Sequence, residues 1–212
     1  SIDKKFIISV LILLLLSISK SFGIDLNNLN TKKGVITLMY HRFNENKYPS
    51  TNVRNEIFVE HLKEIKNSKI EFITFEKFEK IIKTSIEENY LLLTIDDAFE
   101  SFYVNAWPIL KNKQIPFVLF VSTREIGKHG YMNWEQIKEL DSNNLVTIGN
   151  HSHSHEYLID WKENKIKSDL ETSIKIFEKK LGYSPKIFSY PFGEYSITLK
   201  KIVSDLNFKI AF

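Results

Sequence analysis

The sequence predicts an α/β domain built around a parallel sheet. Short apolar segments alternate along the chain with segments of helical periodicity, and repeated β-then-α units of this kind are typical of parallel sheets. The apolar segments are continuous rather than alternating, as expected for strands that are covered on both faces. Seven strand candidates favour a distorted parallel (β/α) barrel over an open, doubly wound sheet.

The strand candidates are short runs of β-branched, leucine and aromatic residues. In chain order they cover residues 35–40, 70–73, 90–95, 117–121, 145–148, 187–190 and 208–212. The final run ends at Phe212, whereas most domains finish with a helix or a polar tail. We therefore expect the barrel to be incomplete at its C-terminal side.

Five segments between these runs carry apolar residues on one helical face. The clearest helix is expected over residues 166–181, where Gly182 would form the C-cap. Thr74 is a candidate N-cap for a second helix, and Asn133 with Gln136 resembles a capping box for a third. The apolar faces of the other four helices lie within residues 57–65, 75–82, 137–140 and 199–206.

The composition fits one globular domain and limits its chemistry. The chain has 212 residues, of which 43% are hydrophobic and 26% are charged. It contains no cysteine, so any metal ion must be held by histidine, aspartate or glutamate side chains. The formal net charge of +3 falls to +1 without residues 1–23, and a nearly neutral domain gives no support for nucleic-acid binding.

The first residues resemble a targeting segment rather than part of the domain. Lys4 and Lys5 precede the apolar run 6–18, which as a helix would span about 20 Å and fall short of the ~30 Å bilayer core. We expect residues 1–23 to be a signal peptide, with an N-terminal anchor that associates with the membrane as the alternative. Residues 24–34 would form a polar linker. Either interpretation predicts an exported protein in the periplasm, the cell envelope or the extracellular space.

Polar side chains follow four strand candidates at the point where each strand ends. They are His41 after the first strand, Asp96 and Asp97 after 90–95, the segment 151–155 after 145–148, and 191–193 after 187–190. In parallel α/β folds, functional groups collect at the carboxyl ends of the strands. We therefore expect these side chains to share one rim of the sheet.

The carboxylates and histidines on this rim have two interpretations. Asp96 and Asp97 are either solvated turn residues or a pair that divides metal binding from general-base catalysis. His151 and His155 would lie on one side of a helical turn at a spacing that suits Zn²⁺, whereas His153 would face away; otherwise the segment is a polar loop. Together, an Asp/His/His set with free coordination positions is typical of a hydrolytic metal centre.

Three motifs, in this order and spacing, resemble those of polysaccharide deacetylases of the NodB-homology type, carbohydrate esterase family 4. They are TIDDAF (94–99), HSHSH (151–155) and SYPFG (189–193). The segments VITLMYHRF (35–43) and YPSTNV (48–53) more specifically resemble the exopolysaccharide branch, which removes N-acetyl groups from poly-β-1,6-N-acetylglucosamine. The resemblance covers residues 35–212 and implies that they form a NodB-like catalytic domain that acts on a polysaccharide.

The resemblance also implies a metal centre and its base. Asp96 would be the general base, and Asp97, His151 and His155 would hold a divalent ion. Zn²⁺ is favoured as that ion, with Co, Ni, Fe or Mn as alternatives. The reaction would be metal-assisted hydrolysis of the acetamide C–N bond.

The remaining motif residues would support the loop or meet the substrate. Ser152 would hold the histidine loop by hydrogen bonding, while Tyr190, Pro191 and Phe192 would line the substrate groove. A backbone N–H between residues 190 and 193 would bind the oxyanion. Trp134 is a further candidate for stacking on a sugar ring, although packing in the core or at the rim explains it better.

Several positions depart from the family pattern. Ile95 and Ala98 replace a usual Phe and Gly, and Ala98 is expected to fit only with a negative φ. Ser189 stands where many members have an arginine, and the family's late Leu-x-His motif has no match before Phe212. His41 is then a candidate for the missing acid or for a supporting role. These departures leave a catalytically inactive glycan-binding protein, or a hydrolase of non-sugar C–N bonds, as alternatives.

Overall fold

The computed structural model describes residues 33–212, except Ser85. The signal peptide or anchor and most of the linker expected before this range lie outside the described residues. The chain divides into two compact units, residues 1–32 and residues 33–212. Within the described part, no helix combines the length and apolar character needed to cross a membrane.

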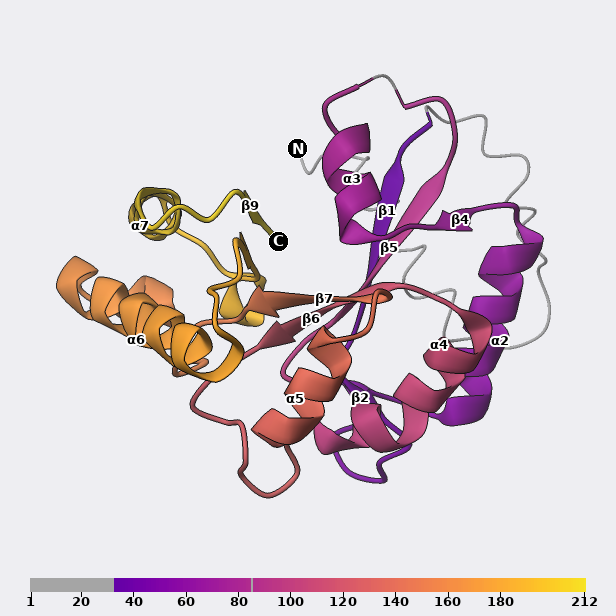
Figure 1. Cartoon of the computed structure of the whole chain (residues 1–212), viewed down its shortest axis with the longest axis horizontal. Coiled ribbons are helices and arrows are strands. Elements are labelled where there is room, and N and C mark those ends of the chain that lie inside the picture. Colours follow the sequence, from indigo (N-terminus) through magenta and orange to yellow (C-terminus); the bar gives the residue numbers. More distant parts are fainter. Residues whose placement is uncertain (1–32, 85) are drawn as a thin grey trace, which may run out of the picture. The chain divides into compact units, whose positions relative to one another are not determined.

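Residues 33–212 form a parallel sheet flanked by helices, as expected (Figure 1). All seven predicted strands are present and every pairing between them is parallel. β4 (Glu71–Phe72) pairs with the beginning of β5, and β6 pairs with its end. The other strands follow the order β1 (Val35–Tyr40), β5 (Tyr90–Ile95), β6 (Phe117–Val121), β7 (Val146–Asn150), β8 (Ile187–Phe188) and β9 (Ile210–Ala211). In the described residues no strand joins β1 to β9, so the barrel is incomplete.

Side chains of the central strands alternate between two apolar clusters, as the two-residue repeat of a strand requires. In β5, Leu91, Leu93 and Ile95 belong to the cluster that covers the outer face, whereas Leu92 faces the cluster on the inner face. The outer cluster includes residues from α2 (Asn55–Asn67), α4 (Trp107–Lys113), α5 (Trp134–Asp141) and α6 (Glu163–Leu181). A third cluster joins α6 to α7 (Ile197–Asp205), and α3 (Phe75–Ile81) contributes to the inner one.

The helix signals in the sequence are confirmed at the atomic level. The Thr74 hydroxyl accepts a hydrogen bond from the Lys77 amide at the start of α3. Asn133 and Gln136 form a reciprocal capping box at the start of α5. Gly182 ends α6 with φ +83°, a conformation that glycine adopts without a steric penalty.

Some elements were not predicted. β2 (Arg42–Phe43) and β3 (Asn52–Val53) form a separate two-stranded sheet, too short to show a periodic pattern. A π-helical turn, η2 (Phe102–Ala106), leads into α4, whose second residue is Pro108. A proline is tolerated in the first helical turn because its missing N–H has no partner there anyway.

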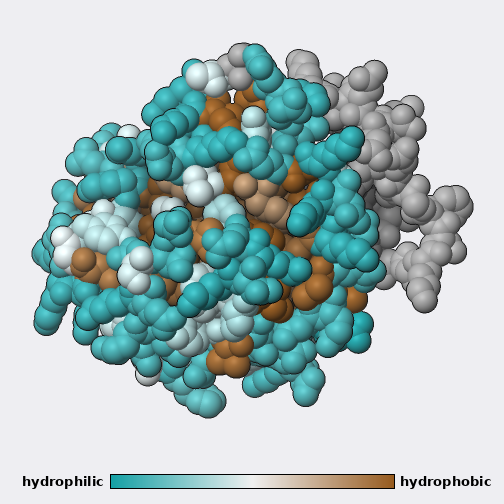
Figure 2. Space-filling model, turned by 45° about the vertical axis from the view of Figure 1, so that its right-hand side comes forward, coloured by the Kyte–Doolittle hydropathy of each residue, from teal (hydrophilic) through white to brown (hydrophobic). Residues whose placement is uncertain are grey.

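The prediction that every strand is buried on both faces is wrong for β1. Ile36 and Met39 are 50% and 53% exposed, and among the described strands β1 lies at the edge of the sheet beside β5. Met39 lines an open cleft rather than a covered face. On the side of the molecule seen in Figure 2, hydrophilic residues cover most of the surface and hydrophobic residues gather in a band across the middle.

Candidate metal centre

Asp96 and Asp97 follow β5 directly and lie at its carboxyl end, as the strand pattern predicts. The Asp96 amide donates to the carbonyl of Tyr40 (2.9 Å), which fixes the start of the loop to β1. Asp96 is only 3% exposed, and its side chain accepts a hydrogen bond from the Ser189 hydroxyl (3.3 Å). Burial raises the pKa of the Asp96 carboxyl, against the opposing effect of the nearby His151 and His41.

His151 follows β7 and is almost fully buried. Its Nδ1 lies 2.8 Å from the carbonyl oxygen of Ser189. Because a carbonyl oxygen can only accept, Nδ1 must carry a proton, and in the neutral ring Nε2 keeps its lone pair. This Nε2 lies 3.4 Å from Oδ1 of Asp97, so the backbone of the loop after β8 orients His151 for ligand binding.

His155 approaches the same carboxylate oxygen from the end of the loop. Its Nε2 is 3.0 Å from Oδ1 of Asp97, and its ring centroid is 4.8 Å from that of His151. The expected helical turn between the two histidines is wrong. Ser152 and His155 have φ values of +68° and +52°, and the Ser152 hydroxyl accepts from the His155 amide (2.9 Å). A closed loop held by Ser152, rather than a helix, brings the two rings together.

Asp97, His151 and His155 form a group that could hold a metal ion. One potential ligand atom from each lies within 4.8 Å of the others. His153 lies outside this group, and its Nδ1 is 2.9 Å from the hydroxyl of Thr123. A carboxylate with two imidazoles matches the protein ligands of catalytic Zn²⁺ sites, in which further coordination positions stay open for water and substrate.

The electrostatics of this group favour a bound cation. Burial alone would raise the pKa of Asp97, but the nearby His151 and His155 outweigh it and hold that pKa well below its usual range. Burial alone would lower the pKa of His151, but the carboxylates of Asp96 and Asp97 raise it. In addition, Oδ1 of Asp96 and Oδ1 of Asp97 are buried without a hydrogen-bond partner among the described residues. Orphaned oxygens beside two imidazoles fit a divalent ion.

The backbone after β5 contradicts the expectation for Ala98. Its φ is +57°, and Asp97 before it has φ +73°, so two consecutive residues adopt the left-handed conformation. Such positions cost about 1–3 kcal/mol each and persist only where the surroundings hold them. Ala98 is fully buried, and its carbonyl accepts from the Met132 amide (2.9 Å). Packing and this hydrogen bond hold the alanine where the family pattern has a glycine.

Two residues that support the histidine loop were missed. Asp169 of α6 is 7% exposed and accepts from the amides of His153 (2.9 Å) and Ser154 (3.1 Å). Asn150 accepts from the Ser152 amide (2.9 Å) and donates to a hydroxyl of α6. Asp169 is the one charged residue within the buried face of its helix, and that position was the available signal.

A cleft of about 660 Å³ opens over the metal-ligand group. Tyr190 and Phe192 line it, as expected, and so does His41. Pro191 is buried and is absent from the lining, so it shapes the turn rather than the surface. Trp134 lies elsewhere and packs edge-to-face against Phe177, so the structure gives it a core role.

One backbone amide in the segment after β8 stays available to a ligand. The Tyr190 amide donates to the carbonyl of Phe212, and the Gly193 amide donates to the carbonyl of Tyr190 (both 2.9 Å). Pro191 has no N–H. Within the described residues the Phe192 amide has no hydrogen-bond acceptor. It belongs to a residue with φ +61° that lines the cleft.

Most of the described domain matches a known protein family. Residues 83–211 match the family model described as polysaccharide deacetylase. The chain belongs to the polysaccharide deacetylase family. This match covers more than half of the chain and includes all three motifs, so the family's enzymatic class and its NodB-like fold apply to the domain described here.

Individual deacetylases show the same likeness. A poly-β-1,6-N-acetyl-D-glucosamine N-deacetylase of Staphylococcus aureus is 26% identical, with 99% of this chain and 85% of that protein covered. The Bacillus subtilis protein YxkH, named for the same family, is also 26% identical, but only 57% of its length is covered, for 75% of this chain.

Two solved structures share the fold. IcaB from Ammonifex degensii superposes with a TM-score of 0.79 at 26% identity, covering 85% of this chain and 83% of that one. The Streptococcus pyogenes deacetylase PplD, solved with acetate, superposes with a TM-score of 0.74 at 23% identity over 84% of this chain and 83% of that one. The expected incomplete (β/α) barrel of the deacetylase family is therefore confirmed.

Proposed function

We propose that this deacetylase removes N-acetyl groups from an N-acetylglucosamine polymer, with poly-β-1,6-N-acetylglucosamine as the favoured substrate. The observation that carries the proposal is a buried carboxylate, Asp96, beside the Asp97/His151/His155 group at the floor of one cleft. The named Staphylococcus relative acts on this polymer, and its likeness extends over nearly the whole chain.

The metal-ligand group would be Asp97, His151 and His155. A divalent ion held there would polarise the acetamide carbonyl and make a nearby water more acidic. Zn²⁺ fits the ligand types best, and Co, Ni, Fe or Mn remain the alternatives.

Asp96 is the proposed general base. Its raised pKa brings the carboxyl closer to the range in which it can both accept and release a proton near neutrality. Its unpaired Oδ1 is the atom that would take the proton from the attacking water. The amide C–N bond then breaks, and the products are acetate and the free amine of glucosamine.

Two further groups complete the proposed chemistry. The free Phe192 amide would donate to the oxyanion, because the other amides of this segment already have acceptors. His41 lines the cleft and would protonate the leaving amine. Ser152 acts only through the loop, where its hydroxyl holds His155.

The location of the reaction rests on the first residues of the chain. The basic start and short apolar run of residues 1–23 support export, either by a cleaved signal peptide or by a retained anchor. A cell-envelope or extracellular deacetylase would meet its polymer outside the cytoplasm.

Acetate release from β-1,6-linked N-acetylglucosamine oligomers tests the proposal. We expect release by the full chain with Zn²⁺, loss on chelation and recovery when the metal is restored. Asp96→Asn is expected to lower kcat by 10²–10⁴-fold, the usual contribution of a general base, while metal still binds. Chitooligomers and a non-sugar acetamide serve as comparison substrates.

Each outcome of this assay separates the alternatives. If the full chain binds the oligomers but releases no acetate with any of the five metals, it is a glycan-binding protein. If it releases acetate faster from the non-sugar acetamide, the substrate class is wrong. Equal rates for the wild type and Asp96→Asn would remove Asp96 from the mechanism.

A further inference from the structure

Two exposed aromatic rings stack on each other at the cleft. The centroids of Tyr157 and Phe192 are 3.9 Å apart and the rings are tilted by only 5°. Tyr157 is 47% exposed and Phe192 is 49% exposed. The pair stands next to the metal-ligand group, because the ring centroid of Phe192 is 4.8 Å from that of His155. Exposed parallel rings offer an apolar surface on which a sugar ring can pack.

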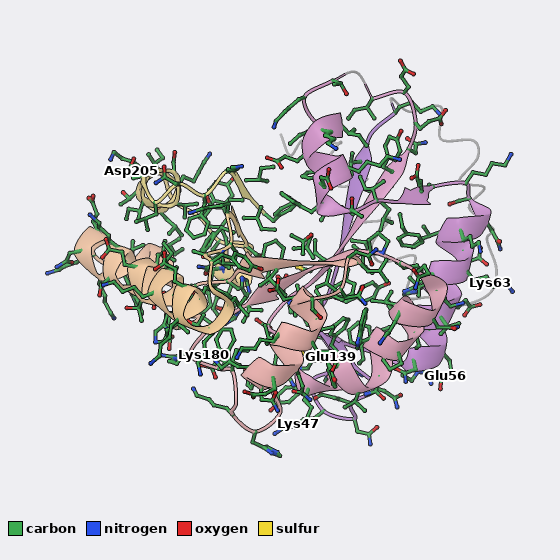
Figure 3. The ribbon with its side chains drawn as sticks, viewed as in Figure 1. Lys47, Glu56, Lys63, Glu139, Lys180 and Asp205 are labelled. Atoms are coloured by element: carbon green, nitrogen blue, oxygen red, sulfur yellow. The ribbon has the colours of Figure 1, made fainter. Side chains whose placement is uncertain are left out.

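The carboxylates that line the cleft have no lysine or arginine among their neighbours in the lining, within the described part of the chain, although the full sequence contains 29 of these residues. Lys63 and Lys180, for example, project outward from α2 and α6 (Figure 3). Besides Asp96 and Asp97, the cleft is lined by one further carboxylate, that of Glu194.

Glu194 follows the stacked aromatic pair closely in the chain. It comes two residues after Phe192, and its amide donates to the carbonyl of Pro191 (3.3 Å) within the same turn. The residue is exposed, and none of the ion pairs found in the described residues includes it. Its carboxylate is therefore available to a cationic ligand.

We propose that Tyr157, Phe192 and Glu194 form a subsite for a glucosamine unit that has already lost its acetyl group. The enzyme would then act preferentially on partly de-N-acetylated chains over fully acetylated ones. This inference rests on the proposed function, because that reaction produces one free amine in each turnover.

The chemistry of the three side chains fits such a unit. A glucosamine ring has an apolar face that packs on aromatic rings, and its ammonium group is attracted both to a carboxylate and to the faces of Tyr and Phe. Away from the metal-ligand group, a uronic acid or a phosphorylated sugar would meet the Glu194 carboxylate and no lysine or arginine, which disfavours its binding at this subsite. The subsite therefore favours neutral and cationic amino-sugar units.

Binding of a β-1,6-linked glucosamine tetramer tests the subsite without turnover. This tetramer carries no acetyl group, so it binds but cannot react. Titration calorimetry of the full chain is expected to show binding at low salt that weakens about two- to five-fold in Glu194→Gln, the range of one exposed ion pair. Glu178→Gln, which removes an exposed carboxylate from α6, is the matched control and should bind as the wild type does.

Tyr157→Ala separates the aromatic contribution from the charge. Its effect should persist at high salt, whereas the effect of Glu194→Gln should fade as salt screens the charge. In competition assays, kcat/KM for a tetramer with one free amine should exceed that for the fully acetylated tetramer, and Glu194→Gln should reduce the ratio.

The inference is overturned if Glu194→Gln binds the glucosamine tetramer as tightly as the wild type and Glu178→Gln do. It is also overturned if an anionic oligosaccharide binds more tightly than the glucosamine tetramer. If only the proposed function fails, the result is a different one. No oligomer would release acetate, but binding of the glucosamine tetramer would still weaken in Glu194→Gln.

Discussion

Ser189 connects the proposed base to one of the proposed metal ligands. Its hydroxyl donates to Oδ2 of Asp96 (3.3 Å), while its carbonyl oxygen fixes the proton on Nδ1 of His151 (2.8 Å). Its amide donates to the carbonyl of Asn150 (2.9 Å) and so joins β7 to the loop after β8. One small buried residue thus positions the Asp96 carboxylate through its side chain and the His151 ring through its backbone.

Because these two functions use different atoms, a substitution can separate them. Ser189→Ala removes the hydroxyl but keeps the carbonyl, so we expect kcat to fall about tenfold, at the lower end for a hydrogen bond to a charged group, with little change in metal affinity. Ser189→Thr, which restores a hydroxyl, should recover much of the rate. Unchanged kcat in Ser189→Ala, or loss of metal in that variant, would contradict this division.

At the level of single residues, the sequence indicates the candidate base and metal ligands better than it indicates the residues that position them. Asp96, Asp97, His151 and His155 all stand at strand ends, where the parallel-sheet rule predicts functional groups. The carbonyl of Ser189 acts across a gap in the chain that no local pattern reveals, and the place of Asp169 on the apolar face of its helix does not show which amides it binds. The positive φ of Ala98 was missed for the same reason, since it is imposed by Met132 and by packing.

At the level of elements, α6 anchors the histidine loop to the sheet. Asp169 accepts two loop amides, and Asn150 at the end of β7 donates to the hydroxyl of Ser173 (2.8 Å). Gly149 lets the Phe120 ring lie against the β7 backbone, because a Cβ at this position would overlap that ring. The geometry of the loop is therefore set by α6, β7 and β6 together.

Asp169→Asn tests the role of α6. The amide nitrogen of Asn would face a backbone donor where the carboxylate now accepts, so the free energy of unfolding is expected to fall by about 1–3 kcal/mol. Metal affinity should fall about tenfold or more, as is usual when a group that orients ligands is lost.

Asp205→Asn is the matched control for this variant. Asp205 is an exposed partner of Lys201 on α7 and projects from the periphery of the molecule (Figure 3), so both quantities should stay near wild type. Urea unfolding measures the free energy of unfolding, and zinc titration measures the metal affinity. If Asp169→Asn has the same free energy of unfolding and the same zinc affinity as Asp205→Asn, then α6 does not hold the loop.

The elements themselves were predictable where their patterns were long. The apolar runs of β5 and β6 and the periodic face of α6 gave their positions to within a few residues. The pairing of β2 with β3 and the π-helical entry into α4 depend on tertiary contacts over very short stretches. Exposure of the β1 side chains depends on which other elements pack over them, which no residue of β1 encodes.

At the level of the whole molecule, the sheet explains why distant motifs meet. β5, β7 and β8 run parallel, so the segments that follow them emerge at the same edge. Asp97 and His151 are more than fifty residues apart in the chain. This arrangement brings Oδ1 of Asp97 to 3.4 Å from Nε2 of His151. The catalytic assignment therefore depends on one testable property of the fold, which is that these side chains hold a single ion.

Zinc titration of the metal-free chain is the most direct test of this centre. We expect one Zn²⁺ per chain, with binding strongly weakened in Asp97→Ala, His151→Ala and His155→Ala. His153→Ala is the control from the same loop and should bind zinc like the wild type, because His153 lies outside the metal-ligand group. Zinc binding that survives Asp97→Ala, or that is lost only in His153→Ala, would contradict the metal centre described here.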